Sequence, residues 1–416
     1  MHAPRIFRQI YLYTGRASLA AALTLGAVAG GGCQGGELDS PTGGSGGSGA
    51  SGGTGGSGDT GGSSGIGGTG GTGGSSGTGG TGGTGGTGGT GGSSGTGGSG
   101  AQKPALLIGN TRGDSISLYD QESGAYVREF VPAGSGGLKD PDFMLLRGDG
   151  FLYVSSGIDP SNSAILRYRA DTGEPAGVFA QGGGLRRPYG LAFGPDGKLY
   201  VSSFLSDQLL RYDAVTGAFL DVFAEGNEAP GGLNGPNGLA FGPDGLLYVT
   251  TQGSVAKDGE ATFPGLPSQV LRYNIATGEG SVFIDQPAPS PDSAGFISLL
   301  GLAFGPDCDA GVCDLFVSDF ANDIRRYDPS GTLLDTMPTG FTGTSPRNNS
   351  MGGLTFGEGR RLFTVGFDTT DPAAPGTILR FDDATGDPLP AEGQSGAVFV
   401  AGDTRMKRPI GITAWP

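Results

Sequence analysis

A short phrase that recurs along the chain constrains its fold more than any other feature. Gly-Leu-Ala-Phe-Gly-Pro-Asp-Gly occupies 190–197 and 238–245, and shorter or weaker copies occupy 143–150, 301–307 and 353–357. The copies start 47 residues apart (143 to 190) to 63 residues apart (238 to 301). Internal repetition with periods of this order is typical of solenoids, propellers and arrays.

Each copy predicts a strand, a tight turn and a second strand. In the turn, proline presets φ, aspartate bonds its own backbone, and glycine accepts positive φ. The second strands are rich in β-branched and aromatic residues, at 199–203, 247–251 and 315–319. A further hairpin follows, as at 210–223, so each unit holds four short strands, which is a propeller blade.

The number of units and their offset predict how the fold closes. Six first strands can be found, but the sixth, 411–415, lies at the C-terminus, whereas the N-terminal unit begins with its second strand at 105–109. We therefore expect an all-β protein, a six-bladed β-propeller in which the C-terminal strand closes the first blade. Such closure removes the free sheet edges of an open array.

The N-terminal region predicts export. Residues 1–32 have the layout of a signal peptide, in which basic residues precede an apolar run too short to span a membrane. Two cleavage sites remain open: Ala27-Val28-Ala29 suits ordinary signal peptidase, and Gly30-Gly31-Gly32-Cys33 resembles a lipobox. Lipidation of Cys33 would anchor the protein at the outer membrane or cell surface, and plain secretion is the alternative.

Cysteine use fits an exported protein. Cys308 and Cys313 are close enough in sequence to form a disulfide, which suits an oxidising compartment, and they leave Cys33 as the odd thiol. Residues 33–103 are a Gly/Thr/Ser-rich stretch with almost nothing apolar to bury, so we expect a disordered tether there. The propeller then occupies 104–416.

Composition excludes several classes of function. The net charge of -15 argues against nucleic-acid binding, which requires a basic surface. The single histidine, His2, lies in the predicted signal peptide. The processed chain therefore lacks the residues for Ser-His-Asp or Cys-His catalysis and for histidine-ligated zinc.

One phrase also carries a family resemblance. Pro-Asn-Gly-Leu-Ala-Phe-Gly-Pro-Asp-Gly-Leu-Leu-Tyr-Val, at 236–249, resembles the NHL-repeat and gluconolactonase-like six-bladed propellers, which include streptogramin lyases. The resemblance covers nearly all of 104–416 and implies the fold. It leaves function open, because these propellers serve as enzymes and as binding platforms. It also implies histidine catalysis for the lyases, which this chain cannot supply.

The residues just before the six first strands should ring the channel mouth, on the face that carries the most variable connections. They are Asp142, Tyr189, Asn237, Leu300, Gly352 and Ile410. The resemblance implies that this ring can hold a divalent metal, and Asp142 and Asn237 are the candidate ligands for Ca²⁺. We take Asp142, Tyr189 and Asn237 as the candidate ligand-binding residues.

Basic residues in neighbouring connections suggest a second candidate site. Arg187, Lys407 and Arg408 would form an anion-binding crescent for a carboxylated or phosphorylated glycan, the alternative being solvated loop charges. Another set recurs on the third strand of every blade but the first and predicts a structural role: Arg167, Arg211, Arg272, Arg326 and Arg380.

These observations favour a non-catalytic binding or display module on the cell envelope, monomeric, lipid-anchored to the membrane, with an envelope glycan or a protein as its ligand. Two alternatives remain. One is a metal-dependent lactonase or lyase with its site at the channel mouth. The other is a structural scaffold that binds no ligand.

Overall fold

The computed structural model describes residues 103–306, 308, 313–371 and 373–416. The predicted signal peptide (1–32), Cys33 and all of the predicted tether (33–103) except Lys103 lie outside the described residues. Within those residues, no helix is both long and apolar enough to cross a membrane. The named elements of the described residues are all strands, except for the short 3₁₀ turns η1 (Ser135–Gly137) and η2 (Phe204–Ser206).

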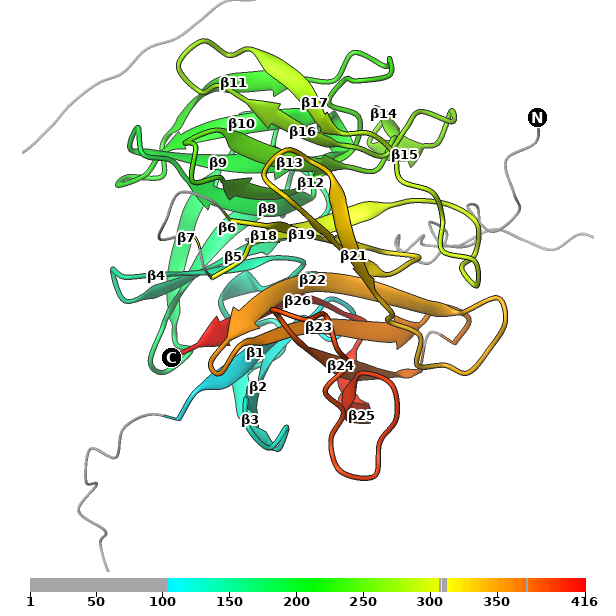
Figure 1. The fold of residues 1–416 in the computed structure, drawn as a ribbon. Helices are drawn as coiled ribbons and strands as arrows, with labels where there is room; N and C mark the ends of the chain where they lie inside the picture. The colour runs from blue at the N-terminus through cyan, green and yellow to red at the C-terminus, as the bar shows by residue number, and fades with distance from the viewer. Residues whose placement is uncertain (1–102, 307, 309–312, 372) are drawn as a thin grey trace, which may run out of the picture. The chain divides into compact units, whose positions relative to one another are not determined.

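Six four-stranded antiparallel sheets form the blades, as predicted (Figure 1). Blades one and two, from first to fourth strand, are β26 (Pro409–Trp415), β1 (Ala105–Asn110), β2 (Ser115–Asp120), β3 (Tyr126–Val131); then β4 (Met144–Arg147), β5 (Phe151–Ser156), β6 (Ala164–Arg169), β7 (Pro175–Gln181). Blades three and four are β8 (Pro188–Phe193), β9 (Lys198–Ser203), β10 (Gln208–Asp213), β11 (Phe219–Glu225); then β12 (Pro236–Phe241), β13 (Leu247–Thr251), β16 (Val270–Tyr273), β17 (Gly280–Ile284).

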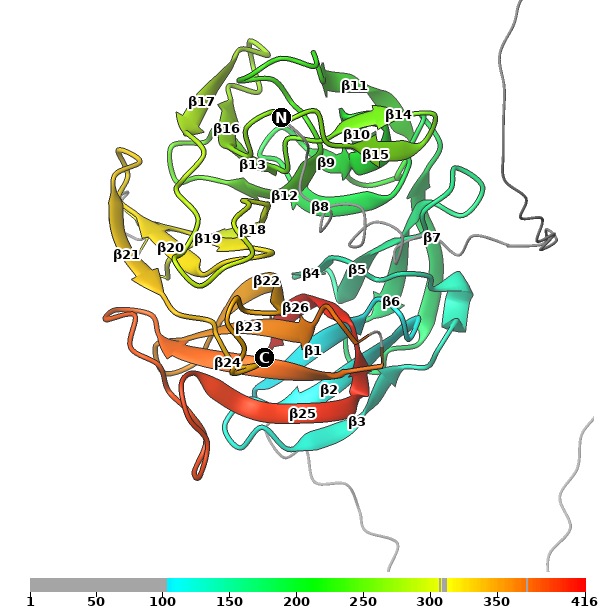
Figure 2. The same ribbon diagram turned by 90° about the vertical axis from the view of Figure 1, so that its right-hand side faces the viewer.

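Blades five and six are β18 (Leu299–Phe304), β19 (Leu315–Asp319), β20 (Ile324–Tyr327), β21 (Leu333–Met337); then β22 (Asn349–Gly357), β23 (Arg361–Asp368), β24 (Pro375–Asp382), β25 (Val398–Lys407). The long connection inside blade four forms a hairpin of its own, β14 (Val255–Lys257) with β15 (Glu260–Thr262). Figure 2 shows the six first strands around a common centre and the fourth strands outside.

The C-terminal strand closes the ring, which confirms the predicted offset. β26 pairs antiparallel with β1, from Ala105 opposite Trp415 to Asn110 opposite Pro409. In the figures the red end of the chain accordingly lies beside its cyan start. The Trp415 indole N–H donates a 2.6 Å hydrogen bond to the carbonyl of Ala170, in blade two. One side chain thus joins the last strand to two blades.

Aromatic side chains pack blade against blade. Tyr200 of β9 meets Phe223 of its own blade and Phe241 of the next edge-to-face, with ring centroids 5.3 and 5.5 Å apart. Its hydroxyl donates to Asp196 of the Pro-Asp-Gly turn, at 3.0 Å. Blades two and four repeat the same arrangement around Tyr153 and Tyr248. The repeated phrase therefore encodes both the hairpin and the contact between blades.

The recurring arginines belong to the same packing, as predicted. Arg211 forms a two-point ion pair with Asp221 across the strand pair β10–β11, at 2.6 and 2.7 Å, and its guanidinium lies over the Phe223 ring. Stacking on a phenylalanine recurs for the other four: Arg167, Arg272, Arg326 and Arg380.

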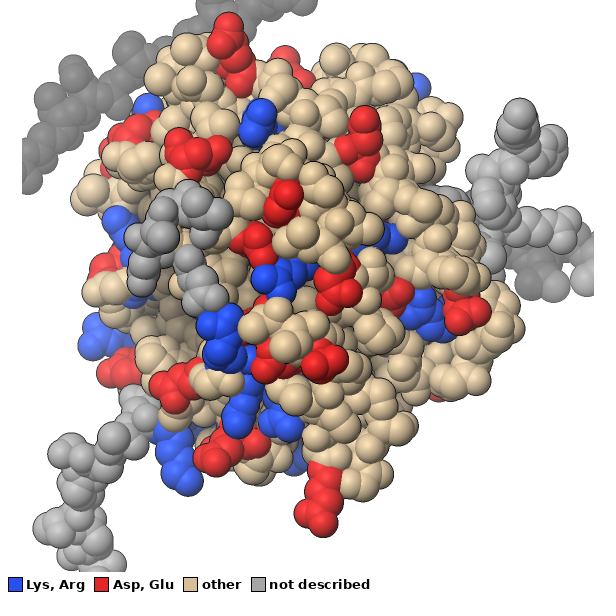
Figure 3. All heavy atoms as spheres, in the orientation of Figure 1, with Lys and Arg blue, Asp and Glu red and all other residues tan. Residues whose placement is uncertain are grey.

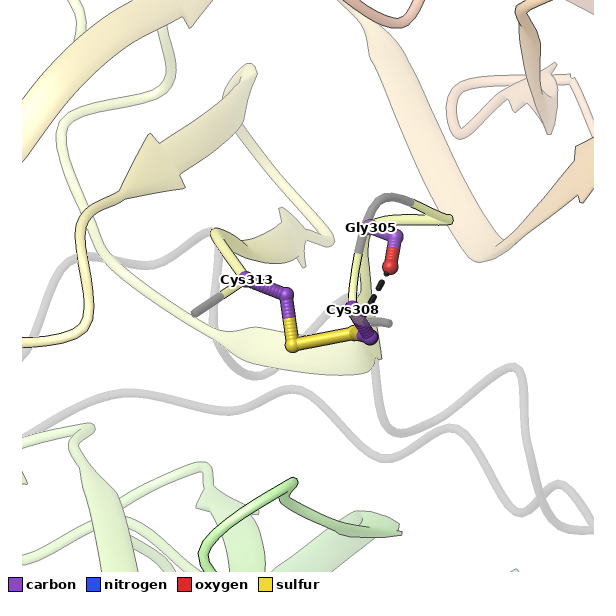
Figure 4. Close-up of a disulfide and its surroundings, with 3 residues drawn as sticks. All are labelled: Gly305, Cys308 and Cys313. Carbon is purple, nitrogen blue, oxygen red and sulfur yellow. Dashed lines mark hydrogen bonds between the residues drawn. A yellow bond between two sulfur atoms is a disulfide. The ribbon is translucent and has the colours of Figure 1, made fainter. Parts of the chain in front are cut away.

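The predicted disulfide is present. Cys308 and Cys313 are joined, with their Cα atoms 4.6 Å apart, in the connection between β18 and β19 (Figure 4). In blades three and four the equivalent connection is a tight Pro-Asp-Gly turn, so the bridge closes an enlarged version of that turn.

Candidate functional site

The six predicted mouth residues lie in a ring, but their position relative to the strands differs from the prediction. Only Asp142 precedes its strand; the others lie inside their first strands, where a β-bulge interrupts the pairing, as between Pro188 and Leu191. The bulge places two residues opposite one, and the second is usually glycine. A Cβ on Gly190 would lie 2.4 Å from the carbonyl oxygen of Asn237, so neighbouring strands touch through backbone there.

Two halves of this ring differ in chemistry. Blades two, three and four contribute Asp142, Tyr189 and Asn237, and the other three blades contribute Leu300, Gly352 and Ile410. Leu300 and Ile410 pack with Phe320 and Phe367 in one apolar cluster, and all four are more than nine-tenths buried. The channel mouth is therefore polar on one side and sealed by hydrophobic side chains on the other.

Asp142 is the centre of the polar half. Its carboxylate accepts a 3.1 Å hydrogen bond from the Thr111 hydroxyl and pairs with the Arg187 guanidinium at 3.6 Å. The two paired side chains are only 2 % and 4 % exposed. Burial raises the pKa of Asp142, and the positive charges of Arg187 and Arg408 oppose that rise.

Tyr189 and Asn237 complete the polar half. Tyr189 packs edge-to-face on Phe204, and burial raises its pKa to about 12, so the phenol stays protonated. The Asn237 amide donates to the Leu299 carbonyl at 3.4 Å, while its buried Oδ1 has no hydrogen-bond partner among the described residues.

Charged residues with unusual backbone conformations surround this cluster. Asp140, Arg187 and Arg408 each precede a proline at the entry to a first strand, with φ of 42°, 47° and 51°. Residues other than glycine rarely adopt positive φ, and backbone strain of this kind is found mostly at functional sites. In blade four the residue that precedes the proline of the first strand is Gly235, which adopts φ of 66° without strain.

The residues present do not fit a calcium ion. Ca²⁺ needs 6 to 8 oxygen ligands. The described residues contain no group of three or more His, Cys, Asp or Glu side chains able to hold a metal. Asp142 is already paired with Arg187, and a second guanidinium, that of Arg408, lowers its affinity for a cation further. We derive no chemistry through a metal here.

The predicted basic crescent is divided by its ion pairs. Arg187 is buried against Asp142, so it does not face a ligand. Three further cations of the same connections are paired with aspartates: Lys139 with Asp114, Arg347 with Asp323, and Arg405 with Asp403. Basic and acidic side chains are likewise interspersed on the side of the propeller drawn in Figure 3.

Arg408 differs from its neighbours. Its half-buried guanidinium lies over the Phe367 ring, 5.5 Å from the centroid, and makes no ion pair or side-chain hydrogen bond with other described residues. Burial and the charge of Arg187 lower its pKa from the ordinary arginine value. Lys407 points to solvent beside it. Of the predicted crescent, Arg408 is therefore the residue whose partly buried cation can take an anion.

Arg408 lines a cavity of about 290 Å³, which we call the blade-six cavity. Its wall includes Phe296 and Phe320, from two different connections, Phe367, near the end of β23, and Asp368, Thr369, Thr370 and Asp371, which follow it. Asn349, at the start of β22, also lines it, and its buried Oδ1 has no hydrogen-bond partner among the described residues. The first strands line a larger hollow of about 540 Å³ along the channel, mostly with small and apolar side chains.

Sequence reasoning missed the residues that shape this cavity. Phe296, Phe320, Phe367 and Asn349 lie in or beside connections whose lengths differ from blade to blade, so the repeat pattern does not align them. One signal was present for the strained residues: Asp140, Arg187 and Arg408 are the charged residues that directly precede a proline at a first strand.

Fold and site together define a six-bladed β-propeller with a polar, partly sealed channel mouth and a neighbouring aromatic cavity. No protein-family model matches the chain, and no curated protein matches its sequence. Solved structures with a similar fold include a nidogen/laminin complex, at 14% identity over 75% of this chain and 98% of that chain, with a TM-score of 0.50.

A virginiamycin B lyase from Staphylococcus aureus and a streptogramin B lyase structure are also similar, each at 15% identity and a TM-score of 0.42. They cover 72% and 74% of this chain and 82% and 83% of their own. The fold that the predicted resemblance implies, a six-bladed β-propeller, is present in the strand topology itself. At identities of 14 and 15%, no activity is transferred from these structures to this chain.

Proposed function

We propose that this protein is an exported binding module of the cell envelope, without catalytic activity, that holds a small ligand in the blade-six cavity. The observation that carries the proposal is the cavity itself: an aromatic wall with one unneutralised guanidinium and one unsatisfied amide oxygen. Largely apolar hollows with a few converging polar groups are the usual form of small-ligand sites.

A cavity-filling variant tests this proposal. Ala374 lines the cavity, whereas its neighbour Ala373 is exposed and does not. Calorimetric titration with a panel of envelope saccharides should show binding to the wild type and to A373W, and affinity at least about tenfold lower for A374W. If A374W binds as well as A373W, the ligand site lies elsewhere on the propeller.

Anchoring through Cys33 is part of the same proposal and has its own test. The wild-type chain, expressed in a bacterial host with radiolabelled fatty acid, should carry label and sediment with membranes. Cys33→Ala should carry no label and should be found in the soluble fraction. A labelled C33A protein, or a soluble and unlabelled wild type, would favour cleavage after Ala29 and plain secretion.

The enzyme alternative has less support. A metal-dependent lactonase or lyase needs several oxygen ligands at the mouth, and Asp142 is engaged with Arg187. The residues that remain, Tyr189 and Asn237, offer a protonated phenol and an amide, neither of which is a ready base at neutral pH. Release of product from a lactone, abolished by Asp142→Asn and by EDTA, would reverse this preference.

A further inference from the structure

The blade-six cavity combines features that narrow the class of ligand, provided that the proposed function holds. Its volume, about 290 Å³, lies at the lower end of ligand sites, so it suits one ring-sized group rather than a folded segment. The phenylalanines offer flat apolar surface. A sugar ring matches this, because its C–H faces pack on aromatic rings while its hydroxyls bond polar groups at the edge.

The positive charge of Arg408 at the cavity indicates that the bound sugar ring carries a single negative charge. Arg408 is a half-buried cation with a second guanidinium, Arg187, close by. Since Arg187 already has Asp142 as its partner, Arg408 is the cation that lacks one. An anion that reaches Arg408 relieves the repulsion between the two guanidinium groups and replaces the water that Arg408 loses through burial.

A carboxylate fits better than a phosphate. Two acidic residues, Asp368 and Asp371, also line the cavity, so a second negative charge on the ring that occupies it would be repelled. The planar guanidinium of Arg408 can bind both oxygens of a carboxylate at once. Asn349 then supplies the remaining contact: its Oδ1, in a residue only 3% exposed, can accept a hydrogen bond from a sugar hydroxyl.

We propose that the blade-six cavity binds a uronic acid residue of an acidic saccharide, with the sugar carboxylate on Arg408, the ring against Phe320 and Phe367, and a hydroxyl on Asn349. The carboxylate and ring then lie beside each other, as Arg408 and Phe367 do. Arg408 also has a positive φ of 51°, a strained conformation of the kind that is concentrated at ligand sites.

A matched pair of probes tests the ligand class. Calorimetry on the full processed chain should show binding of trigalacturonate, and affinity about tenfold or more weaker for its fully methyl-esterified form, which has the same rings without charge. Arg408→Gln should weaken trigalacturonate binding by about 10- to 100-fold and leave the ester unaffected. Lys407→Gln, a loss of equal charge from the adjacent exposed residue, should change affinity by less than about threefold.

Each other result overturns the inference in a distinct way. If acid and ester bind equally well and A374W still loses binding, the cavity is the binding site but does not recognise a carboxylate. If an N-acetylated tripeptide with a free carboxylate binds as tightly, the site does not require a sugar ring. If R408Q does not fold, the acid-to-ester ratio of the wild type still decides. If A374W and R408Q both bind saccharides as tightly as the wild type, the proposed function at this cavity is wrong as well.

Discussion

Single residues at the channel mouth show how the propeller neutralises the charges that it buries. Asp142, Arg187 and Arg408 come from three successive strand entries, and the buried Asp142 carboxylate forms an ion pair with only one of the two guanidinium groups, that of Arg187. Each of these side chains is therefore sensitive to the loss of another, and stability measurements can separate the paired charge from the free one.

Asp142→Asn should destabilise the fold by about 3 kcal/mol or more, because it leaves Arg187 buried without a counter-charge. The side chains of this pair are 2% and 4% exposed, whereas those of Asp171 and Arg169 are 66% and 56% exposed. Asp171→Asn is thus a matched control, with an expected change within about 0.5 kcal/mol. Urea denaturation followed by circular dichroism measures both; equal effects would show that Asp142 does not neutralise Arg187.

Asp140 should make stability depend on pH. Burial, with the nearby negative charge of Asp142, raises its pKa to about 6. The folded chain then binds more protons than the unfolded chain between about pH 4, near the ordinary aspartate pKa, and pH 6. Through this group, the free energy of unfolding falls as the pH rises across that window and stays lower above it.

Asp140→Asn should therefore stabilise the protein at pH 7, by about 1 to 3 kcal/mol, and much less below pH 4. Asparagine also tolerates the positive φ at this position, but that gain does not depend on pH. Urea midpoints of wild type and variant at pH 3.5, 5 and 7 separate the two contributions. A difference that is constant with pH would mean that the Asp140 carboxyl is not perturbed.

At the scale of the strand, the repeated arginines stabilise blades and take no part in binding. Arg211→Ala should cost about 1 to 3 kcal/mol, since it removes a two-point ion pair to Asp221 and the stacking on Phe223. Arg169→Ala, on the neighbouring blade, removes an exposed pair with 3.9 Å between charged atoms and should be nearly neutral. Both variants should bind saccharide as the wild type does; weaker binding in R211A would give this set a function.

The elements that the sequence predicts well are those with a local cause. Pro-Asp-Gly turns and alternating strands recur in register, so the four strands of each blade and the closure of the ring follow from the repeats. The start of each first strand was misplaced, because the bulge at Tyr189-Gly190 depends on contact with the backbone of the next blade. Local patterns do not contain that contact.

The candidate site was predicted only in part, for a related reason. The ring residues share one position in the repeat, so Asp142, Tyr189 and Asn237 could be grouped from sequence. Which charges neutralise one another could not, since Arg187 reaches Asp142 across a blade boundary. The aromatic wall combines Phe367 of β23 with Phe296 and Phe320 from connections of unequal length, which the repeat pattern does not align.

At the scale of the whole molecule, closure by the last strand is the contact on which the site depends. β26 brings Ile410, beside Arg408, to the mouth and Trp415 to the opposite end of the same strand. Without β26, Leu106 and Leu107 of β1, both fully buried, lie on an open sheet edge. Ligand binding at Arg408 is therefore expected only when the propeller is closed.

Deletion of residues 410–416 should abolish cooperative folding. It removes the buried side chains of Ile410, Ile412 and Trp415, which together contribute about 5 to 9 kcal/mol, an amount comparable to the total stability of a typical domain. Deletion of Pro416 alone, which is exposed, should have no effect. Calorimetric melting measures the difference; a sharp transition in the longer truncation would mean that five blades and an open sixth suffice.

The only tryptophan gives an independent reading of closure in the intact chain. Trp415 is 8% exposed, donates to Ala170 and lies edge-to-face on Phe130, so its native emission should be blue-shifted from that of free indole. Its transition in urea should coincide with loss of the β-sheet signal, because the last strand cannot leave without opening the ring. An earlier fluorescence transition would instead show that β26 detaches first, and ligand binding, which needs Arg408 in place, should then suppress it.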